Sequence, residues 1–339
     1  MRRGRFAQEV AGLEPGWFAM VMATGILSTV ALALRMPWLS VPLLPIAGAG
    51  YLVLCALTAW RLLRHWPRML ADFSTPGRAF GFFTFVAAGD VLGIRLALGG
   101  VVAIGEALMA VSTAAWLCLT YAIPARLIAI RPKPPLGEAV NGTWMIWVVG
   151  TQSVAAAAAQ VASLDAGART GFAFVAVALW VLGVVLYLVL ITIVTLRMLV
   201  AELAPEQLTH AYWVAMGATA ISVLTAARIL ELHTRLPIAT EALTAVTFAF
   251  WVFGSWWIPL LLLLGLWRHL LRRVPLSYHP SLWSMVFPLS MYAAASQAFG
   301  QVAGIGLLGA VARVGVWVAL AAWVATFAGM LVSARRLVR

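Results

Sequence analysis

Ten long apolar runs follow one another along the chain and leave no stretch long enough for a separate soluble domain. A helix needs about 20 mostly apolar residues to cross the hydrocarbon core of a bilayer. The runs lie at approximately 15–34, 40–63, 79–98, 99–124, 141–163, 170–196, 210–230, 241–267, 281–303 and 309–334. Only 10% of the residues are charged, against about 25% in soluble domains. The pattern predicts an all-α integral membrane protein and excludes a soluble enzyme or a nucleic-acid-binding domain.

Basic residues indicate which side of the membrane each loop occupies. They gather in the N-terminal segment, in the loops that follow even-numbered helices and at the C-terminus, whereas Arg35, Arg169 and Arg235 fall in the opposite loops. Arginine and lysine are enriched in cytoplasmic loops. We therefore expect a cytoplasmic tail at 1–14, a transport domain of ten membrane helices at 15–334 and a cytoplasmic tail at 335–339, in the cell (inner) membrane.

An aromatic residue marks the start of every odd-numbered helix. The markers are Trp17, Phe80, Trp144, Trp213 and Trp283, separated by 63, 64, 69 and 70 residues. Such a spacing predicts five repeated two-helix hairpins, which an axis along the membrane normal would relate to one another. Five hairpins around that axis give an inner ring of odd-numbered helices, an outer ring of even-numbered helices and a quasi-fivefold central pore. Ordinary anchoring of aromatic rings at the membrane interface is the alternative explanation.

Small and polar residues are concentrated in the odd-numbered helices. Candidates for lining a pore or bending its helices are Thr24, Gly25, Gly89, Gly93, Gly150, Thr151, Gly217 and Ser290. Glycine and proline at membrane depth allow backbones to approach closely or to line a cavity. Plain helix–helix packing would use the same residues, so both interpretations stay open.

Two carboxylates, Asp90 and Glu106, lie at similar predicted depths on neighbouring helices. An ionised carboxylate inside a membrane is costly, so we expect these groups to be paired or protonated. Proton linkage to the movement of an organic acid is the functional interpretation. A structural pairing of a carboxylate with Arg95 or with backbone donors is the alternative.

Residues that would support enzymatic or cofactor chemistry do not form a recognisable constellation. The histidines fall at expected helix ends or in loops, which disfavours haem ligation between helices, and Cys55 and Cys118 lack metal-type spacing. We expect no catalytic residues, no metal and no cofactor. An integral membrane redox enzyme remains the rival of another class.

Six stretches resemble the tellurite-resistance/dicarboxylate transporter family, which includes malate permeases, sulfite efflux pumps and slow-type anion channels. They are PGWFAMVMATGILS from Pro15, FGFFTFVAAGDVLG from Phe80, NGTWMIWVVGTQSVA from Asn141, YWVAMGATAIS from Tyr212, FWVFGSWWIPLLLLLGLWRH from Phe250 and YHPSLWSMVFPLSMY from Tyr278. They occur in the family's order and touch most of the chain.

This resemblance implies five helical hairpins around a quasi-fivefold pore, assembled as a homotrimer in the lipid bilayer. It implies transport of small anions, with C4-dicarboxylates such as malate as the first expectation and sulfite, tellurite, nitrate or chloride as the alternative. A phenylalanine on the ninth helix closes the pore in relatives, and the matching residue is Phe287, beside Pro288. Proline removes a backbone donor and bends a helix, which would press this ring towards the axis.

Overall fold

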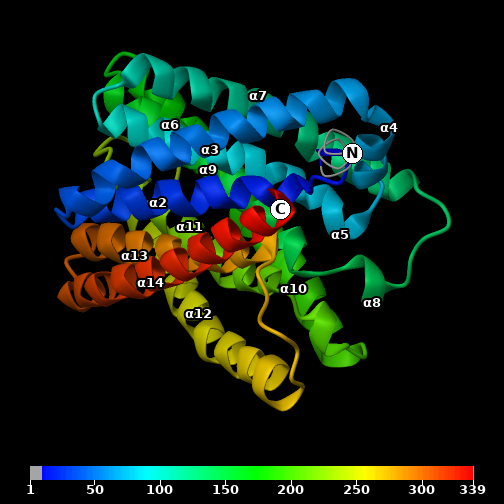
Figure 1. Cartoon of the computed structure of the whole chain (residues 1–339). Helices are drawn as coiled ribbons and strands as arrows, with labels where there is room; N and C mark the ends of the chain where they lie inside the picture. Colours follow the sequence, from blue (N-terminus) through cyan, green and yellow to red (C-terminus); the bar gives the residue numbers. More distant parts are fainter. Residues whose placement is uncertain (1–9, 339) are drawn as a thin grey trace.

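The computed structural model describes residues 10–338, and in this part of the chain every regular element is helical (Figure 1). Most of the expected tail at 1–14 lies outside the described residues. The long helices are α2 (Ala19–Ala33), α3 (Pro37–Arg64), α6 (Phe83–Leu98), α7 (Val102–Ala129), α9 (Met145–Leu164), α10 (Arg169–Val200), α11 (Val214–Leu230), α12 (Thr240–Leu266), α13 (Trp283–Val302) and α14 (Gly306–Val338). Short helices α4 (Trp66–Phe73), α5 (Pro76–Ala79) and α8 (Leu136–Ala139) lie in the loops.

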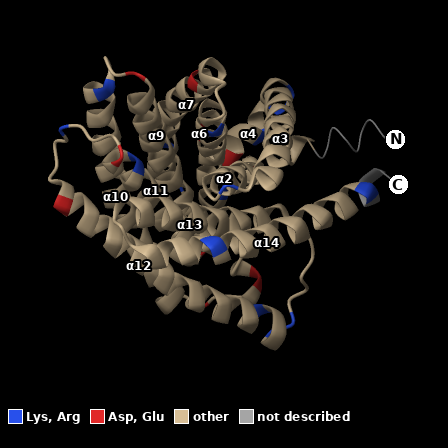
Figure 2. Ribbon diagram, turned by 90° about the vertical axis from the view of Figure 1, so that its left-hand side faces the viewer, with Lys and Arg blue, Asp and Glu red and all other residues tan. Residues whose placement is uncertain are grey.

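Nine helical segments in the described residues are long and apolar enough to cross a membrane, which confirms the all-α membrane fold. Helix α13 is not among the nine, because serine and glutamine side chains interrupt its apolar sequence. The helix predicted at 99–124 begins instead at Val102, since Gly99 and Gly100 form the preceding turn and Gly100 has a φ of 89°. Helix α14 continues beyond 334 to Val338. Charged residues are few and lie mostly at helix ends and in loops (Figure 2).

The long helices form two concentric layers. Helices α2, α6, α9, α11 and α13 pack side by side in chain order, and α13 closes the ring against α2. Each is followed by an antiparallel outer helix that packs against it, namely α3, α7, α10, α12 and α14. In four inner segments 72–83% of the residues are buried, against 22–39% in the outer ones. Odd-numbered helices are therefore inside and even-numbered helices outside, as predicted.

A turn of 3-10 helix precedes every inner helix. These turns are η1 (Pro15–Phe18), η2 (Phe80–Phe82), η3 (Gly142–Trp144), η5 (His210–Trp213) and η7 (Pro280–Leu282), and they also contact one another in a closed ring. Four marker aromatics lie within these turns, and Trp283 directly follows η7. The spacing seen in the sequence thus marks equivalent points of five hairpins.

A second repeated feature, which the sequence analysis missed, fastens the outer layer to the inner one. Indole N–H groups of Trp116, Trp180, Trp251 and Trp323 on outer helices donate to the next inner helix. Their acceptors are Thr151 Oγ1, the Ser222 carbonyl, Ser296 Oγ and Thr24 Oγ1, all at 2.9–3.0 Å. These tryptophans are separated by 64, 71 and 72 residues, close to the spacing of the marker aromatics.

Arginines near the last turns of outer helices fix the loops that lead into the 3-10 turns. Arg61 donates to the Ala11 carbonyl at 3.2 Å, Arg126 to Ser74 Oγ at 2.9 Å, Arg197 to the Gly137 carbonyl at 2.8 Å and Arg268 to the Leu208 carbonyl at 2.7 Å. Each acceptor lies shortly before the inner helix of the same hairpin. These basic residues therefore hold the hairpin ends together in addition to marking one face of the protein.

Candidate functional site

A narrow cavity of about 40 Å³ lies on the axis of the inner ring. All five inner helices contribute to its wall: Ile26 and Thr29 from α2; Asp90, Val91 and Ile94 from α6; Ser153, Ala156 and Gln160 from α9; Ile221, Leu224 and Arg228 from α11; and Met291 from α13. These residues come from the parts of the helices beyond the 3-10 turns. The cavity therefore occupies the half of the ring that is farther from those turns.

Asp90 is the only carboxylate among the residues that line the axial cavity. Its side chain is fully buried, and Oδ2 accepts a hydrogen bond from Ser153 Oγ at 2.6 Å. Oδ1 is buried and has no hydrogen-bond partner within the described part of the chain. Since buried carboxylate oxygens are normally satisfied, an open Oδ1 in a cavity wall indicates a place for a further group.

The second predicted carboxylate, Glu106, lies elsewhere. It is exposed on outer helix α7, so the structure does not bring it together with buried Asp90. Arg95 does not pair with Asp90 either: its guanidinium donates to Ser28 Oγ at 3.0 Å and Ser40 Oγ at 2.8 Å. Asp90 therefore faces the axis without either expected charged partner.

Hydrogen-bond donors reach the axial cavity from α11 and α9. Arg228 lines the wall and forms an ion pair with Glu231 at 2.9 Å, while the amide side chain of Gln160 lines the wall from α9. A guanidinium and a carboxamide both supply N–H donors. This end of the cavity can therefore donate hydrogen bonds to an anion.

Phe287 is buried on α13, one turn before a residue of the cavity wall. Met291 lies four residues further on, so the two side chains share one face of the helix and are about 6 Å apart along its axis. The adjacent Pro288 packs closely against α11, since a Cβ placed on Gly217 would lie 2.8 Å from Pro288 Cγ. Along α13, Phe287 therefore lies at a level between that of the axial cavity and that of the ring of 3-10 turns.

The predicted glycines lie at close contacts between helices. A Cβ on Gly25 would lie 2.8 Å from Val91 Cγ1, and one on Gly150 would lie 2.9 Å from Phe83 Cδ1. Gly89 and Gly93 face outer helix α7 in the same way. Such contacts allow close approach of the helix backbones, and none of these glycines belongs to the wall of the axial cavity.

The predicted hydroxyl residues also lie beside that wall, not in it. Thr24 and Thr151 accept the indole bonds from the outer layer, and Ser290 donates to the Val286 carbonyl at 3.0 Å. Thr29, Gln160 and Arg228 line the cavity instead and were not among the predicted pore-lining candidates.

The sequence spacing of the lining residues identifies the face of each inner helix that lines the axial cavity. On α9 they are Ser153, Ala156 and Gln160, and on α11 they are Ile221, Leu224 and Arg228. Both sets follow the i, i+3, i+7 pattern of a single helix face.

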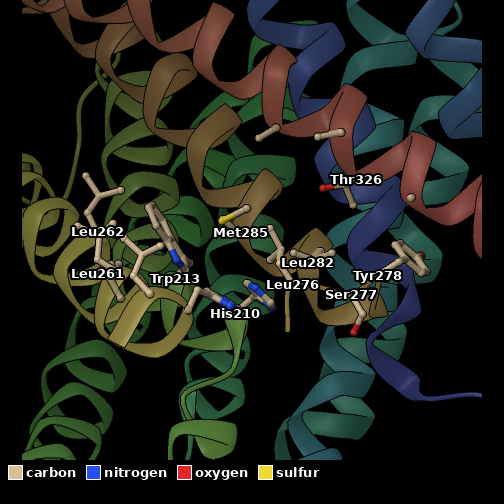
Figure 3. A pocket seen from close by; sticks show the side chains of 17 residues that line it. His210, Trp213, Leu261, Leu262, Leu276, Ser277, Tyr278, Leu282, Met285 and Thr326 are labelled. Carbon is tan, nitrogen blue, oxygen red and sulfur yellow. The ribbon is translucent and has the colours of Figure 1, made fainter. Parts of the chain in front are cut away.

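A larger cavity of about 670 Å³ lies off the axis, with walls from α12, α14, η5, η7, the segment between α12 and α13, and Met285 of α13. Figure 3 shows mainly apolar side chains in it, among them Leu262, Leu276 and Met285, together with the imidazole of His210. No residue of α2, α6 or α9 contributes to its lining. It therefore belongs to the wall between two outer helices and not to the centre of the ring.

Comparison with known proteins agrees with this architecture. Residues 12–331 match the family described as SLAC1, voltage-dependent anion channel. An uncharacterized membrane protein of Mycobacterium tuberculosis is 43% identical over 148 residues, which cover 43% of this chain and 75% of that protein. Two uncharacterized transporters of Methanocaldococcus jannaschii are 23% and 24% identical over 94% and 85% of this chain, and over 93% and 83% of their own lengths. The chain is a multi-pass membrane protein that belongs to the SLAC1 family of anion channels and transporters.

Proposed function

We propose that the protein moves small anions across the membrane along the axis of the inner ring, through a pathway that Phe287 closes. The observation that carries this proposal is the axial cavity, to which all five inner helices contribute and which lies one helical turn beyond Phe287. A hydrophobic side chain on the axis of a pore closes it by excluding water. Displacement of the ring would open the path.

Hydrogen-bond donors in the wall of the axial cavity support a preference of the pathway for anions. Arg228 and the Gln160 amide line the cavity and supply N–H donors, whereas the hydroxyls of Thr29 and Ser153 already donate to the Gly25 carbonyl and to Asp90 Oδ2. At the other end of the bundle Arg197 and Arg268 bond to loop carbonyls, so they contribute charge to that rim while remaining fixed, whereas Arg61 is paired with Asp72. Weak, dispersed donors are suited to passage, because a transported ion must also leave each site.

Two substrate classes follow from different observations. The family resemblance supports C4-dicarboxylates such as malate. The size of the axial cavity supports a small inorganic anion such as chloride, nitrate, sulfite or tellurite, since about 40 Å³ is only a few times the roughly 10–15 Å³ that a cavity needs to hold one water. A dicarboxylate requires the cavity to widen together with the movement of Phe287.

The membrane setting of this proposal is the cell (inner) membrane, with both termini cytoplasmic. The arginine-rich helix ends and loops on the side of the 3-10 turns support that orientation. A homotrimer is the assembly that the family resemblance supports, and many large apolar side chains on the outer helices are available to lipid or to neighbouring copies. The competing redox-enzyme function would give the purified protein a haem or flavin absorption band.

An anion-replacement series in proteoliposomes tests the proposal. Chloride, nitrate, sulfite, tellurite and malate are offered in turn, and flux or reversal potential is compared with protein-free vesicles. We expect flux that follows the anion gradient, and the anion that gives the largest rate identifies the substrate class. The same flux with and without protein would refute the function.

A further inference from the structure

Asp90 combines three features that the anion pathway alone does not explain. Its side chain is fully buried, it lines the axial cavity, and its Oδ1 has no partner in residues 10–338. A carboxylate in the wall of an anion pathway would repel the ion that the pathway carries. The position of this group therefore requires a chemical account of its own.

The groups around Asp90 do not neutralise a negative charge there. Ser153 on α9 supplies one neutral donor to Oδ2. Ser112 on α7 is a second neutral hydroxyl beside the Asp90 carboxyl, and the Tyr51 phenol on α3 lies by Gly89, the neighbouring residue of α6. Thr29 on α2 and Met291 on α13 bring no charge into the cavity.

The arginines on α11 and α6 have other partners. Arg228 on α11 lines the cavity but is paired with Glu231, and Arg95 on α6 bonds to the serines that join α2 and α3. An ionised Asp90 therefore leaves the axial cavity with an uncompensated negative charge. A protonated Asp90 leaves it neutral and has an O–H group that can donate into the cavity.

We propose that the axial cavity is a binding site for a small anion and that the site fills only when Asp90 carries a proton. This inference rests on the proposed function and adds a proton requirement to it. The O–H of Asp90, the Gln160 amide and Arg228 then form the donor set around the ion. Loss of the proton replaces one of these donors with a negative oxygen.

The expected size of the effect follows from Coulomb repulsion. Two like charges about 4 Å apart in an effective dielectric of about 20 disfavour occupancy by roughly 10³-fold. Anion flux should therefore fall as the pH rises, in proportion to the fraction of protein in which Asp90 is protonated.

Nitrate flux in proteoliposomes from about pH 5 to about pH 10 tests this inference. Asp90→Asn keeps an uncharged donor in place, so we expect its flux to be independent of pH and, at high pH, at least tenfold above that of the unaltered protein. Glu106→Gln is the matched control, since it removes an exposed carboxylate from the adjacent helix, and its pH profile should be that of the unaltered protein.

Ser153→Ala supplies a second test that keeps the carboxylate. The serine hydroxyl favours the ionised form of Asp90, so its removal should shift the midpoint of the flux profile to higher pH. An unaltered protein that conducts equally at all pH values would overturn the inference, as would a folded Asp90→Asn variant that retains the original profile. Absence of anion flux at every pH, even in Phe287→Ala, would instead overturn the proposed function and the inference with it.

Discussion

Replacement of Phe287 by alanine tests the proposed gate most directly. The ring is 1% exposed, so opening of the proposed gate would transfer a buried aromatic side chain to a wet lumen. Exposing a buried phenylalanine costs about 1.5–3 kcal/mol, and each 1.4 kcal/mol corresponds to about a factor of ten in an equilibrium. Removing the ring abolishes this cost, so we expect anion flux to rise by about 10-fold to 100-fold.

The assay is anion flux into proteoliposomes at equal protein content, with folding verified by gel filtration and thermal melting. Phe287→Leu should raise flux less, because a branched apolar side chain still discourages water from entering the constriction. An unchanged flux in correctly folded Phe287→Ala would refute the assignment of this residue as the gate.

Phe299 provides the matched control on the same helix. It is also fully buried, but it lies twelve residues further on and so points about 120° away from Phe287 around α13. Phe299→Ala should destabilise the protein by about 3–5 kcal/mol without raising flux. A rise in flux for both variants would show that loosening of the ring, and not removal of a gate, opens the path.

Three further predictions address orientation, selectivity and the attachment of the outer layer. In a cysteine-free protein, a single cysteine in place of Arg169 should react with a membrane-impermeant thiol reagent from outside, and one in place of Arg272 should react from the cytoplasm. The reverse labelling would invert the topology. The reversal potential should follow the anion gradient, and tracking of the potassium gradient would exclude anion selectivity. Trp323→Phe removes the indole bond to Thr24 and should cost about 0.5–1.5 kcal/mol of stability, whereas Trp317→Phe, 54% exposed, should cost little.

The layers of the fold were predictable because they follow from composition along the chain. The lengths of the apolar runs predicted the membrane helices, with ends at most a few residues from those observed. The concentration of small residues in odd-numbered helices predicted that these helices lie inside. Glycines are needed where helix backbones meet closely, as Gly217 does against Pro288. The same property explains why glycine was a poor guide to the pore: it marks the contacts between helices and not the axis.

The direction in which a residue points around its helix was the part that the sequence left undetermined. Inner helices are apolar on all sides, so hydrophobic periodicity does not distinguish the axis from the contact with the outer layer. Asp90 and Glu106 were placed at similar depth, yet the first is buried at the axial cavity and the second is exposed on α7. The depth of a residue in the membrane is set by its position along the chain, whereas the direction in which its side chain points is set by the packing of the five hairpins.

The five hairpins place equivalent residues at the same level of the central axis, so a single residue at one level can affect the passage of an anion. Ile26, Asp90, Ser153, Ile221 and Met291 all line the cavity, and their separations of 64, 63, 68 and 70 residues follow those of the marker aromatics. One turn earlier, the corresponding residues are Met22, Val86, Val149, Gly217 and Phe287.

Each level thus holds one residue that differs in kind from its four equivalents: the carboxylate of Asp90 in one and the aromatic ring of Phe287 in the other. Five helices share one axis, so one side chain is enough to block it and one proton is enough to change its charge. The two candidate control residues occupy successive turns on different hairpins. For that reason Phe287→Ala should raise the flux while leaving its pH dependence intact. Asp90→Asn should abolish the pH dependence of the flux while leaving the gate in place.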